Sequence, residues 1–302
     1  MEHMLELQAT IIVLIAVGVL IRRIDLVPAS FRKGLTDLVI YLVLPCNIVS
    51  SFAKQTHAEG MWTDFIIIFF ISVVIQFFSV LYGRWLFRGE NEDRKRCLVY
   101  GMLCPNSGFL GNPIAEGVFG APGLMLASVY LIPQRVCMWS LGLAVFQGSY
   151  NGKDTVKKVL THPCILACLI GLVLMLFQAD LPGVILTPID TIGRCNTALS
   201  MLVIGMILSE INVRELRDKT LFHYTFERLV MLPLIVYVIL LILPVSPLVR
   251  GTSVLLTAMP AGATTSMLAA KYDRDPHFGT SMVIQSTLFS IPALLIWSAI
   301  LT

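Results

Sequence analysis

Two stretches of the chain place proline, glycine and small polar residues inside long apolar segments. The first is Cys104–Pro113, with the sequence CPNSGFLGNP, and the second is Ala258–Thr265, with the sequence AMPAGATT. Proline removes an intrahelical hydrogen bond, and glycine and asparagine lower the cost of leaving helical geometry. The half-helix after such a break begins with free N–H groups and a partial positive charge, which favour a carboxylate. These residues could therefore bind a small anion reversibly.

The composition decides the class of protein in which these breaks occur. Of the 302 residues, 56% are hydrophobic and 14% are charged, and the mean hydropathy is +0.81. An ordinary soluble domain carries about a quarter charged residues, so a soluble enzyme and a disordered chain are both excluded. Apolar stretches of about 20 residues recur along the chain and predict an all-α polytopic membrane protein. Broken backbone in lipid is tolerated where protein covers it or where it lines a watery cavity.

Apolar runs bounded by charges or by Pro/Gly clusters predict ten membrane-spanning helices. Their approximate limits are 5–21, 34–52, 63–86, 97–119, 122–146, 163–177, 187–208, 221–243, 251–270 and 278–301. Seventeen of the 22 Lys and Arg residues fall in the connections after odd-numbered spans, whereas Lys54 and Arg250 fall in the others. The positive-inside rule therefore places the odd-numbered connections in the cytoplasm and both termini outside.

The two breaks occupy matching places in the chain. One interrupts the fourth span and the other interrupts the ninth, as two five-helix repeats would produce. Because five is odd, the second repeat enters the membrane from the opposite face, which predicts an inverted pair covering residues 1–160 and 161–302. Interrupted spans in corresponding positions of two halves indicate the binding site of a secondary transporter. A kink in an ordinary packed helix is the alternative for either break taken alone.

Three basic residues, Arg135, Arg194 and Arg228, fall within predicted spans. Arg135 lies about 20 Å into span five at a rise of ~1.5 Å per residue, which is the depth of the first break. A charge at that depth usually faces a polar cavity. Arg135 is therefore expected either to contact the substrate or to bond the carbonyls that the breaks free. Arg194 and Arg228 are nearer the span ends and are expected to extend toward an interface.

Other polar residues give weaker signals. The seven cysteines fall in or beside apolar spans, so small buried side chains are expected rather than disulfides. Cys164 and Cys168 lie one helical turn apart, but neither a metal site nor a cofactor is predicted from this pair. Carboxylates are absent from the middle of the spans, and no proton-coupling group is visible. Four polar residues could line the site, coordinate a cation or bond neighbouring helices: Asn47, Asn196, Thr264 and Thr265.

The order of the motifs resembles the auxin efflux carrier family, which includes the plant PIN carriers and bacterial relatives often labelled malonate or small-acid permeases. Residues 105–113 (PNSGFLGNP) are similar to the family's crossover in span four. Residues 258–262 (AMPAG), followed by 270–276 (AKYDRDP), resemble the crossover in span nine and the loop after it. Leu44-Pro45 and residues 286–290 also fit, so the resemblance covers most of the chain.

This resemblance implies a fold like that of bile acid/sodium symporters, with elevator-like transport. Spans one, two, six and seven would form a scaffold, through which a homodimer could form, and spans three to five and eight to ten a transport domain. It also implies that Asn106 binds the substrate carboxylate, helped by the half-helix after Pro260, and that Gln134 lines the site. The chain lacks the long loop of the plant proteins between spans five and six, and Asn112 stands where the family usually has an apolar residue.

The sequence thus predicts a secondary carrier for a small organic anion, a mono- or dicarboxylate, in the cytoplasmic membrane. An indole-type aromatic acid is an alternative substrate, because Phe109 and Trp139 could stack on its ring, and a channel or solute sensor is an alternative function. An enzyme and a nucleic-acid partner are not expected, whereas contact with membrane lipid is. The predicted substrate-binding residues are Asn106, Gly108, Phe109, Gly111, Asn112, Gln134, Arg135, Gly262 and Thr264, and the predicted helix-breaking residues are Pro105, Pro113 and Pro260.

Overall fold

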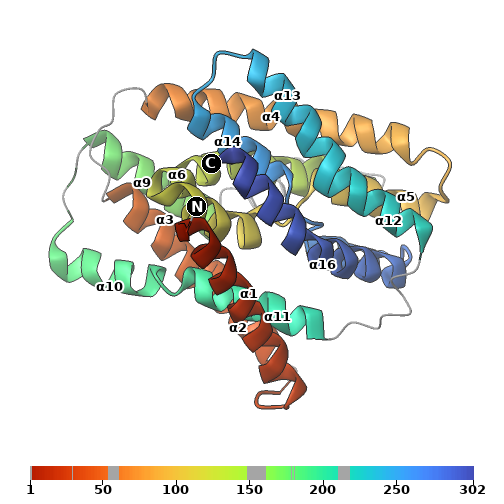
Figure 1. Ribbon diagram of the computed structural model, residues 1–302, viewed down its shortest axis with the longest axis horizontal. Helices are drawn as coiled ribbons and strands as arrows, with labels where there is room; N and C mark the ends of the chain where they lie inside the picture. The colour runs from red at the N-terminus through yellow and green to blue at the C-terminus, as the bar shows by residue number, and fades with distance from the viewer. Residues whose placement is uncertain are drawn as a thin grey trace.

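The computed structural model describes residues 2–28, 30–53, 61–147, 161–177, 179, 181–209 and 218–302 (Figure 1). The regular elements in these ranges are helical. Among the described residues, five segments are long and apolar enough to cross a membrane, namely 31–53, 61–86, 107–146, 219–242 and 276–301. The protein is therefore an all-helical, multi-pass membrane protein. Several basic residues of the predicted connections lie outside the described residues: Lys54, Lys153, Lys157, Lys158, Arg214 and Arg217.

The first half of the chain contains seven α-helices and three π-helical turns among its described residues. The α-helices are α1 (Glu2–Arg23), α2 (Phe31–Leu38), α3 (Leu44–Ala53), α4 (Met61–Leu86), α5 (Glu92–Leu103), α6 (Asn112–Cys137) and α7 (Leu143–Gln147). The π-helical turns are η1 (Val39–Val43), η2 (Ser107–Gly111) and η3 (Met138–Gly142). Such turns are rare in proteins and occur frequently at functional sites, and η2 follows the first predicted break directly.

The second half contains eight α-helices among its described residues. They are α9 (Pro163–Phe177), α10 (Gly183–Gly193), α11 (Asn196–Ser209), α12 (Lys219–Phe226), α13 (Leu232–Ile242), α14 (Pro247–Thr257), α15 (Thr264–Lys271) and α16 (Pro276–Leu301). The π-helical turn η5 (Glu227–Met231) joins α12 to α13. The chain leaves helical geometry between α14 and α15, where the second break is predicted.

Two boundaries need comment. The predicted spans four and five meet at Gly120, whose φ of 68° interrupts α6 with a conformation that glycine adopts at little cost. The prediction of one continuous span over 187–208 is wrong, because α10 ends at Gly193 and α11 begins at Asn196. At this junction Arg194 pairs with Asp190 of the preceding turn at 2.7 Å. Cys195 is exposed there, contrary to the expected buried thiol.

Helices from the two halves pack against each other. α1 lies across α11, and α3 packs on both α9 and α10 (Figure 1). The contact between α1 and α11 is made by two glycines: a Cβ atom on Gly18 would collide with the Leu202 carbonyl, and one on Gly205 would collide with the Ile15 carbonyl. Small residues of this kind let two membrane helices approach until their backbones touch.

Leucine in place of Gly205 should separate α1 from α11. Because the side chain would meet backbone atoms that cannot rotate away, we expect a loss of about 3 kcal/mol, the upper end of the usual cost of overpacking. The measurement is thermal unfolding of the purified protein in detergent. The matched control is Gly34→Leu, since a Cβ atom at Gly34 has open space around it. Equal melting temperatures for the two variants would contradict the glycine contact.

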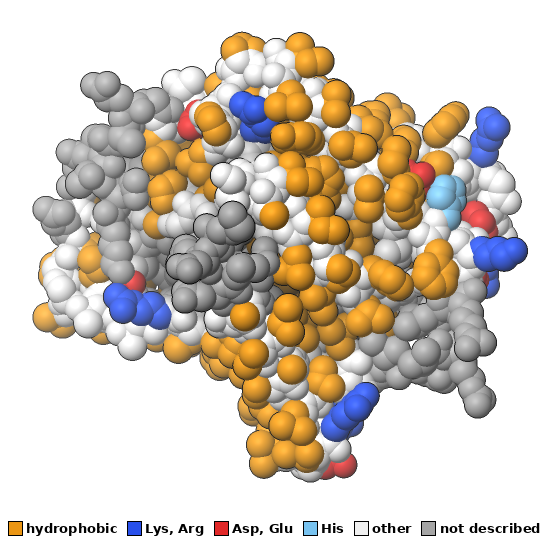
Figure 2. All heavy atoms as spheres, in the orientation of Figure 1, with side chains coloured by type: hydrophobic (Ala, Val, Ile, Leu, Met, Phe, Trp, Pro, Cys, Tyr) orange, Lys and Arg blue, Asp and Glu red, His pale blue; other side chains and the backbone are white. Residues whose placement is uncertain are grey.

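Apolar side chains cover the middle of the face shown in Figure 2, and charged side chains lie toward its edges. α4 carries exposed apolar side chains along one stripe at helical spacing. Six of its large apolar side chains are more than half exposed: Ile66, Phe70, Val74, Phe77, Leu81 and Trp85. Such a stripe is unusual in water and typical of a surface that contacts lipid.

Candidate functional site

The two breaks meet in the interior and bond to each other. Pro105 and Ala261 form an isolated antiparallel bridge. The Asn106 N–H donates to the Pro260 carbonyl at 2.7 Å, and the Gly262 N–H donates to the Cys104 carbonyl at 3.0 Å. This reciprocal pair, hereafter the crossing, satisfies backbone groups that have left helical geometry.

Side chains satisfy further backbone groups at the crossing. Pro260 has no N–H, so the Leu256 carbonyl lacks its usual partner, and the Ser107 hydroxyl donates to it at 2.9 Å. Gln134 Nε2 donates to the Pro105 carbonyl at 3.0 Å. The Ala261 N–H donates to Ser286 Oγ at 3.1 Å. Side chains of α6 and α16 therefore fix the backbone of both breaks.

Arg228 connects the two broken segments. Its Nε donates to the Met259 carbonyl at 2.9 Å and its Nη1 to the Met102 carbonyl at 3.0 Å. The side chain is 1% exposed, so the expectation that Arg228 extends to an interface is wrong. The Met102 carbonyl would ordinarily accept from the N–H of Asn106, which the crossing uses, and the guanidinium replaces that donor. Bonding of freed carbonyls, expected as one alternative for Arg135, is done by Arg228.

Arg135 and Asn106 present unbonded polar groups beside the first break. A Cβ atom on Gly108 would collide with Arg135 Nη2, so the guanidinium lies against the backbone of η2. Within the part of the chain that the structure describes, neither the Arg135 side chain nor the Asn106 side chain makes a hydrogen bond or an ion pair. Both side chains are partly exposed. The amide and the guanidinium are thus available to a ligand, as are the first N–H groups of η2.

The charge of Arg135 also acts on His162, which precedes α9. Burial and the positive charge of Arg135 lower the pKa of His162 to about 3, so the imidazole is neutral at physiological pH. Its Nδ1 accepts from the Cys164 N–H at 3.3 Å at the start of α9. No compensating carboxylate accompanies Arg135 among the described residues, and a bound anion would supply one.

Three further predicted residues, Gly111, Asn112 and Pro113, are buried at the start of α6. Gly111 packs against Leu256 and Met259, where a Cβ atom would approach to 2.7 Å of the Leu256 side chain. Asn112 is 0% exposed, and its amide lacks a hydrogen-bond partner among the described residues. Pro113 does not break a helix, because the helical backbone continues through it from η2 into α6.

Other residues proposed from the sequence lie around these. Phe109 packs against the buried cluster of Leu35, Val203 and Met206, so its ring is engaged in packing. Gly262 is buried in the crossing, and Thr264 begins α15 and is partly exposed. The side chain of Trp139 lies outside the described residues.

Comparison with known sequences places the chain in a family of membrane proteins. A family model described as membrane transport protein matches residues 3–298. The chain belongs to that family. The match confirms the resemblance to auxin efflux carriers. Among curated proteins, an uncharacterized transporter of Methanothermobacter thermautotrophicus is 27% identical over 98% of both chains. An uncharacterized transporter of Methanocaldococcus jannaschii is 22% identical over 96% of both.

Sequence reasoning missed two buried polar residues of this membrane transport protein. It did not assign Arg228 to the crossing, and it did not single out Glu227, which is 9% exposed and accepts from the Tyr82 hydroxyl at 2.6 Å. His223 Nε2 also lies 3.4 Å from the Glu227 carboxylate. The signal was the adjacent Glu–Arg pair inside an apolar span, where charges mark functional or structural sites.

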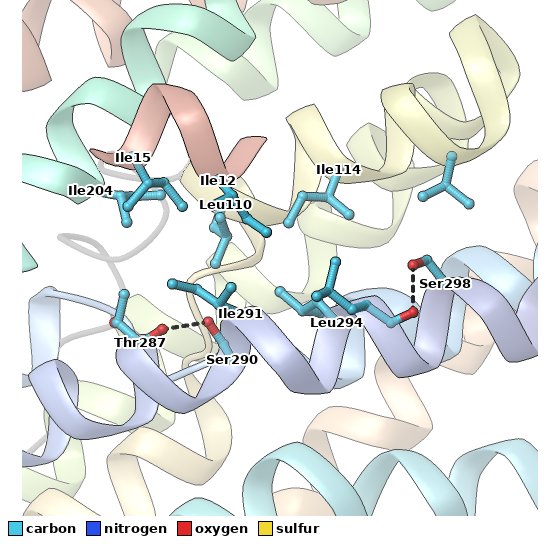
Figure 3. A pocket seen from close by; sticks show the side chains of 12 residues that line it. Ile12, Ile15, Leu110, Ile114, Ile204, Thr287, Ser290, Ile291, Leu294 and Ser298 are labelled. Carbon is cyan, nitrogen blue, oxygen red and sulfur yellow. Dashed lines mark hydrogen bonds between the residues drawn. The ribbon is translucent and has the colours of Figure 1, made fainter. Parts of the chain in front are cut away.

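A narrow apolar pocket lies beside the crossing, with α1, α11, η2 and α6 on one side and α16 on the other (Figure 3). Its unfilled volume is about 40 Å³, which holds little more than a water molecule. The hydroxyls of Thr287, Ser290 and Ser298 line it but donate to carbonyls of their own helix. The pocket therefore suits apolar contact rather than a carboxylate.

Proposed function

We propose that this membrane transport protein is a secondary carrier of a small organic anion. The observation that carries the proposal is the pair of unbonded groups beside the first break, the Asn106 amide and the Arg135 guanidinium. Both have polar hydrogens to donate, and the guanidinium matches a carboxylate in charge and geometry. The crossing beside them is held by seven hydrogen bonds, so the two donors are presented on a fixed backbone.

We propose further that the chain forms two inverted repeats that work as an elevator. The reciprocal bonds of the crossing support this, because each half donates one N–H and accepts at one carbonyl. The packing also crosses between the halves. The first predicted span of the first half (α1) packs on the second span of the second half (α11), and the second span of the first half (α3) packs on the first span of the second half (α9). Together with α2 and α10 these helices would form the scaffold, and the apolar pocket beside α16 would lie where the moving part slides.

The substrate that fits best is a mono- or dicarboxylate. An indole-type acid is less well supported, because the Phe109 ring packs on Leu35, Val203 and Met206. Location in the cytoplasmic membrane with both termini outside and a homodimer through the scaffold stay predictions.

Asn106→Ala should reduce transport at least tenfold while leaving the folded yield unchanged. The Asn106 backbone would keep its bond to Pro260, and the side-chain amide, which has no structural bond among the described residues, would be lost. The measurement is counterflow of radiolabelled carboxylates in proteoliposomes, after thermal-shift screening has selected a ligand. Counterflow at the wild-type rate would overturn the site assignment. An unsaturable, ohmic flux in the unmodified protein would instead favour a channel.

Arg135→Gln should weaken anion binding without unfolding the protein. A charge-assisted hydrogen bond contributes about 1.5–3 kcal/mol, which corresponds to a roughly ten- to hundredfold increase in Kd. Ligand titration by thermal shift would measure it. Arg88→Gln makes the same change at an exposed arginine outside the site and serves as control. Unchanged affinity in Arg135→Gln would show that the guanidinium does not contact the anion.

A further inference from the structure

A second, polar hollow lies away from the crossing, at the junction of α4, α5 and α7. Its volume is about 400 Å³, ten times that of the apolar pocket and large enough for a small polar headgroup. Seven residues line it: Arg84, Glu92, Lys95, Arg96, Val99, Ala144 and Val145. Three cations and one carboxylate therefore face the same space.

Two of these cations have no carboxylate partner among the described residues. Arg84 makes no hydrogen bond or ion pair there, and Arg96 donates Nη1 to the Val145 carbonyl at 2.7 Å. Neighbouring arginines are different: Arg94 pairs with Asp218 at 2.9 Å and with Asp275 at 3.3 Å, and Arg274 pairs with Asp93 at 3.1 Å. Arg94 and Arg274 are thus neutralised by carboxylates, whereas Arg84 and Arg96 of the hollow are not.

The carboxylate of the hollow offsets little of this charge. Glu92 accepts from Lys95 at 3.2 Å, but its side chain is 71% exposed, so water and salt screen the pair. Arg96, in contrast, is anchored by the carbonyl of α7. The hollow therefore presents Arg84 and a fixed Arg96 as excess positive charge, which is suited to a phosphate group.

The exposed stripe of α4 leads to this hollow. Phe77, Leu81 and Trp85 are 54%, 65% and 64% exposed and follow one another at helical spacing, and Arg84 adjoins the last of them. The rings of Tyr82 and Trp85 stack with their centroids 6.3 Å apart. Tyrosine and tryptophan are enriched at the interface between membrane and water. We propose that the hollow binds the phosphate-bearing headgroup of an anionic phospholipid whose acyl chains lie along this stripe. Basic pockets of this kind between membrane helices favour anionic headgroups.

The test uses the full-length protein, stripped of lipid in a neutral detergent and followed by thermal unfolding, a readout that does not depend on transport. Phosphatidylglycerol should raise the melting temperature in a saturable way, and phosphatidylcholine, whose headgroup carries a compensating positive charge, should not. In the double variant Arg84→Gln/Arg96→Gln the shift should disappear. The matched control Arg23→Gln/Arg88→Gln removes two exposed arginines outside the hollow and should keep it.

Three results would overturn the proposal. An equal phosphatidylglycerol shift in the two double variants would mean that general surface charge is responsible. A full shift with soluble glycerol phosphate would identify a free phosphate anion as the occupant. The absence of a shift in the unmodified protein would exclude the site. If Arg84→Gln/Arg96→Gln does not fold, Arg84→Gln/Lys95→Gln keeps Arg96 on the Val145 carbonyl and should still lose most of the shift.

Discussion

Replacing Arg228 with methionine should abolish transport and lower the melting temperature by roughly 5 °C or more. The change leaves the carbonyls of Met102 and Met259 without donors in the interior of a membrane protein. Each buried carbonyl without a partner costs about 1–3 kcal/mol, so about 2–6 kcal/mol is expected in total. For a chain of this size, 1 kcal/mol corresponds to about 2–4 °C. Methionine fills a similar length, so packing loss contributes little.

Thermal unfolding in detergent and transport in proteoliposomes measure the two effects. Arg228→Lys should be intermediate, because one ammonium group lacks the planar fork that reaches two carbonyls. Arg194→Met is the matched control: its side chain is 76% exposed and pairs within its own helical region, so a change within about 0.5 kcal/mol is expected. If Arg228→Met and Arg194→Met have the same melting temperature, the Arg228 guanidinium does not stabilise the two broken segments.

Replacing Gly262 with valine should open the crossing itself. A Cβ atom at this position would lie 2.8 Å from the Cys104 oxygen, which accepts the hydrogen bond of the same residue's N–H. The acceptor cannot move away without losing that bond, so side-chain rearrangement cannot relieve the contact. We expect transport at background and a stability loss of about 3 kcal/mol or more, beyond the usual range of single substitutions.

Gly262→Ala should show the same defects to a lesser degree, because its methyl group already meets the carbonyl. Gly89→Val is the control, since a Cβ atom at Gly89 has no neighbour within 4 Å. Wild-type transport by Gly262→Val would show that the crossing tolerates a wider separation than the bridge between Pro105 and Ala261 implies.

Local sequence chemistry was sufficient to locate the breaks. Pro260 removes an N–H wherever it lies, and Gly108 and Gly262 permit close approach whatever comes near them, so both breaks follow from the sequence. Counting residues at a fixed rise predicted Arg135 at the level of the first break, and its guanidinium lies against Gly108. The membrane class followed from composition, and the family match agrees with it.

Long-range partners could not be predicted in the same way. Arg228 and Met102 are separated by 126 positions, and no local pattern says that their helices meet. The depth of Arg228 in its span allowed the side chain to extend to an interface. In the structure its guanidinium instead bonds the two carbonyls released by the breaks, and these bonds offset the free-energy cost of burying the charge. The same limit applies to the junction of α10 and α11. α10 ends at Gly193, which lies against the Asn47 backbone, and hydropathy did not indicate this end of the helix.

The burial of Arg228 has an electrical consequence. The guanidinium is enclosed beside the crossing, and it makes no ion pair with the described residues. Any displacement of the crossing across the membrane would carry this charge together with that of the adjacent Glu227 carboxylate, so the uncompensated guanidinium of Arg135 would be the charge moved through the membrane field. Each elementary charge is worth about 2.3 kcal/mol per 100 mV. A bound carboxylate would cancel part of the Arg135 charge. Voltage would therefore act more strongly on the empty protein than on the loaded one, so the return step would be the one that senses the membrane potential.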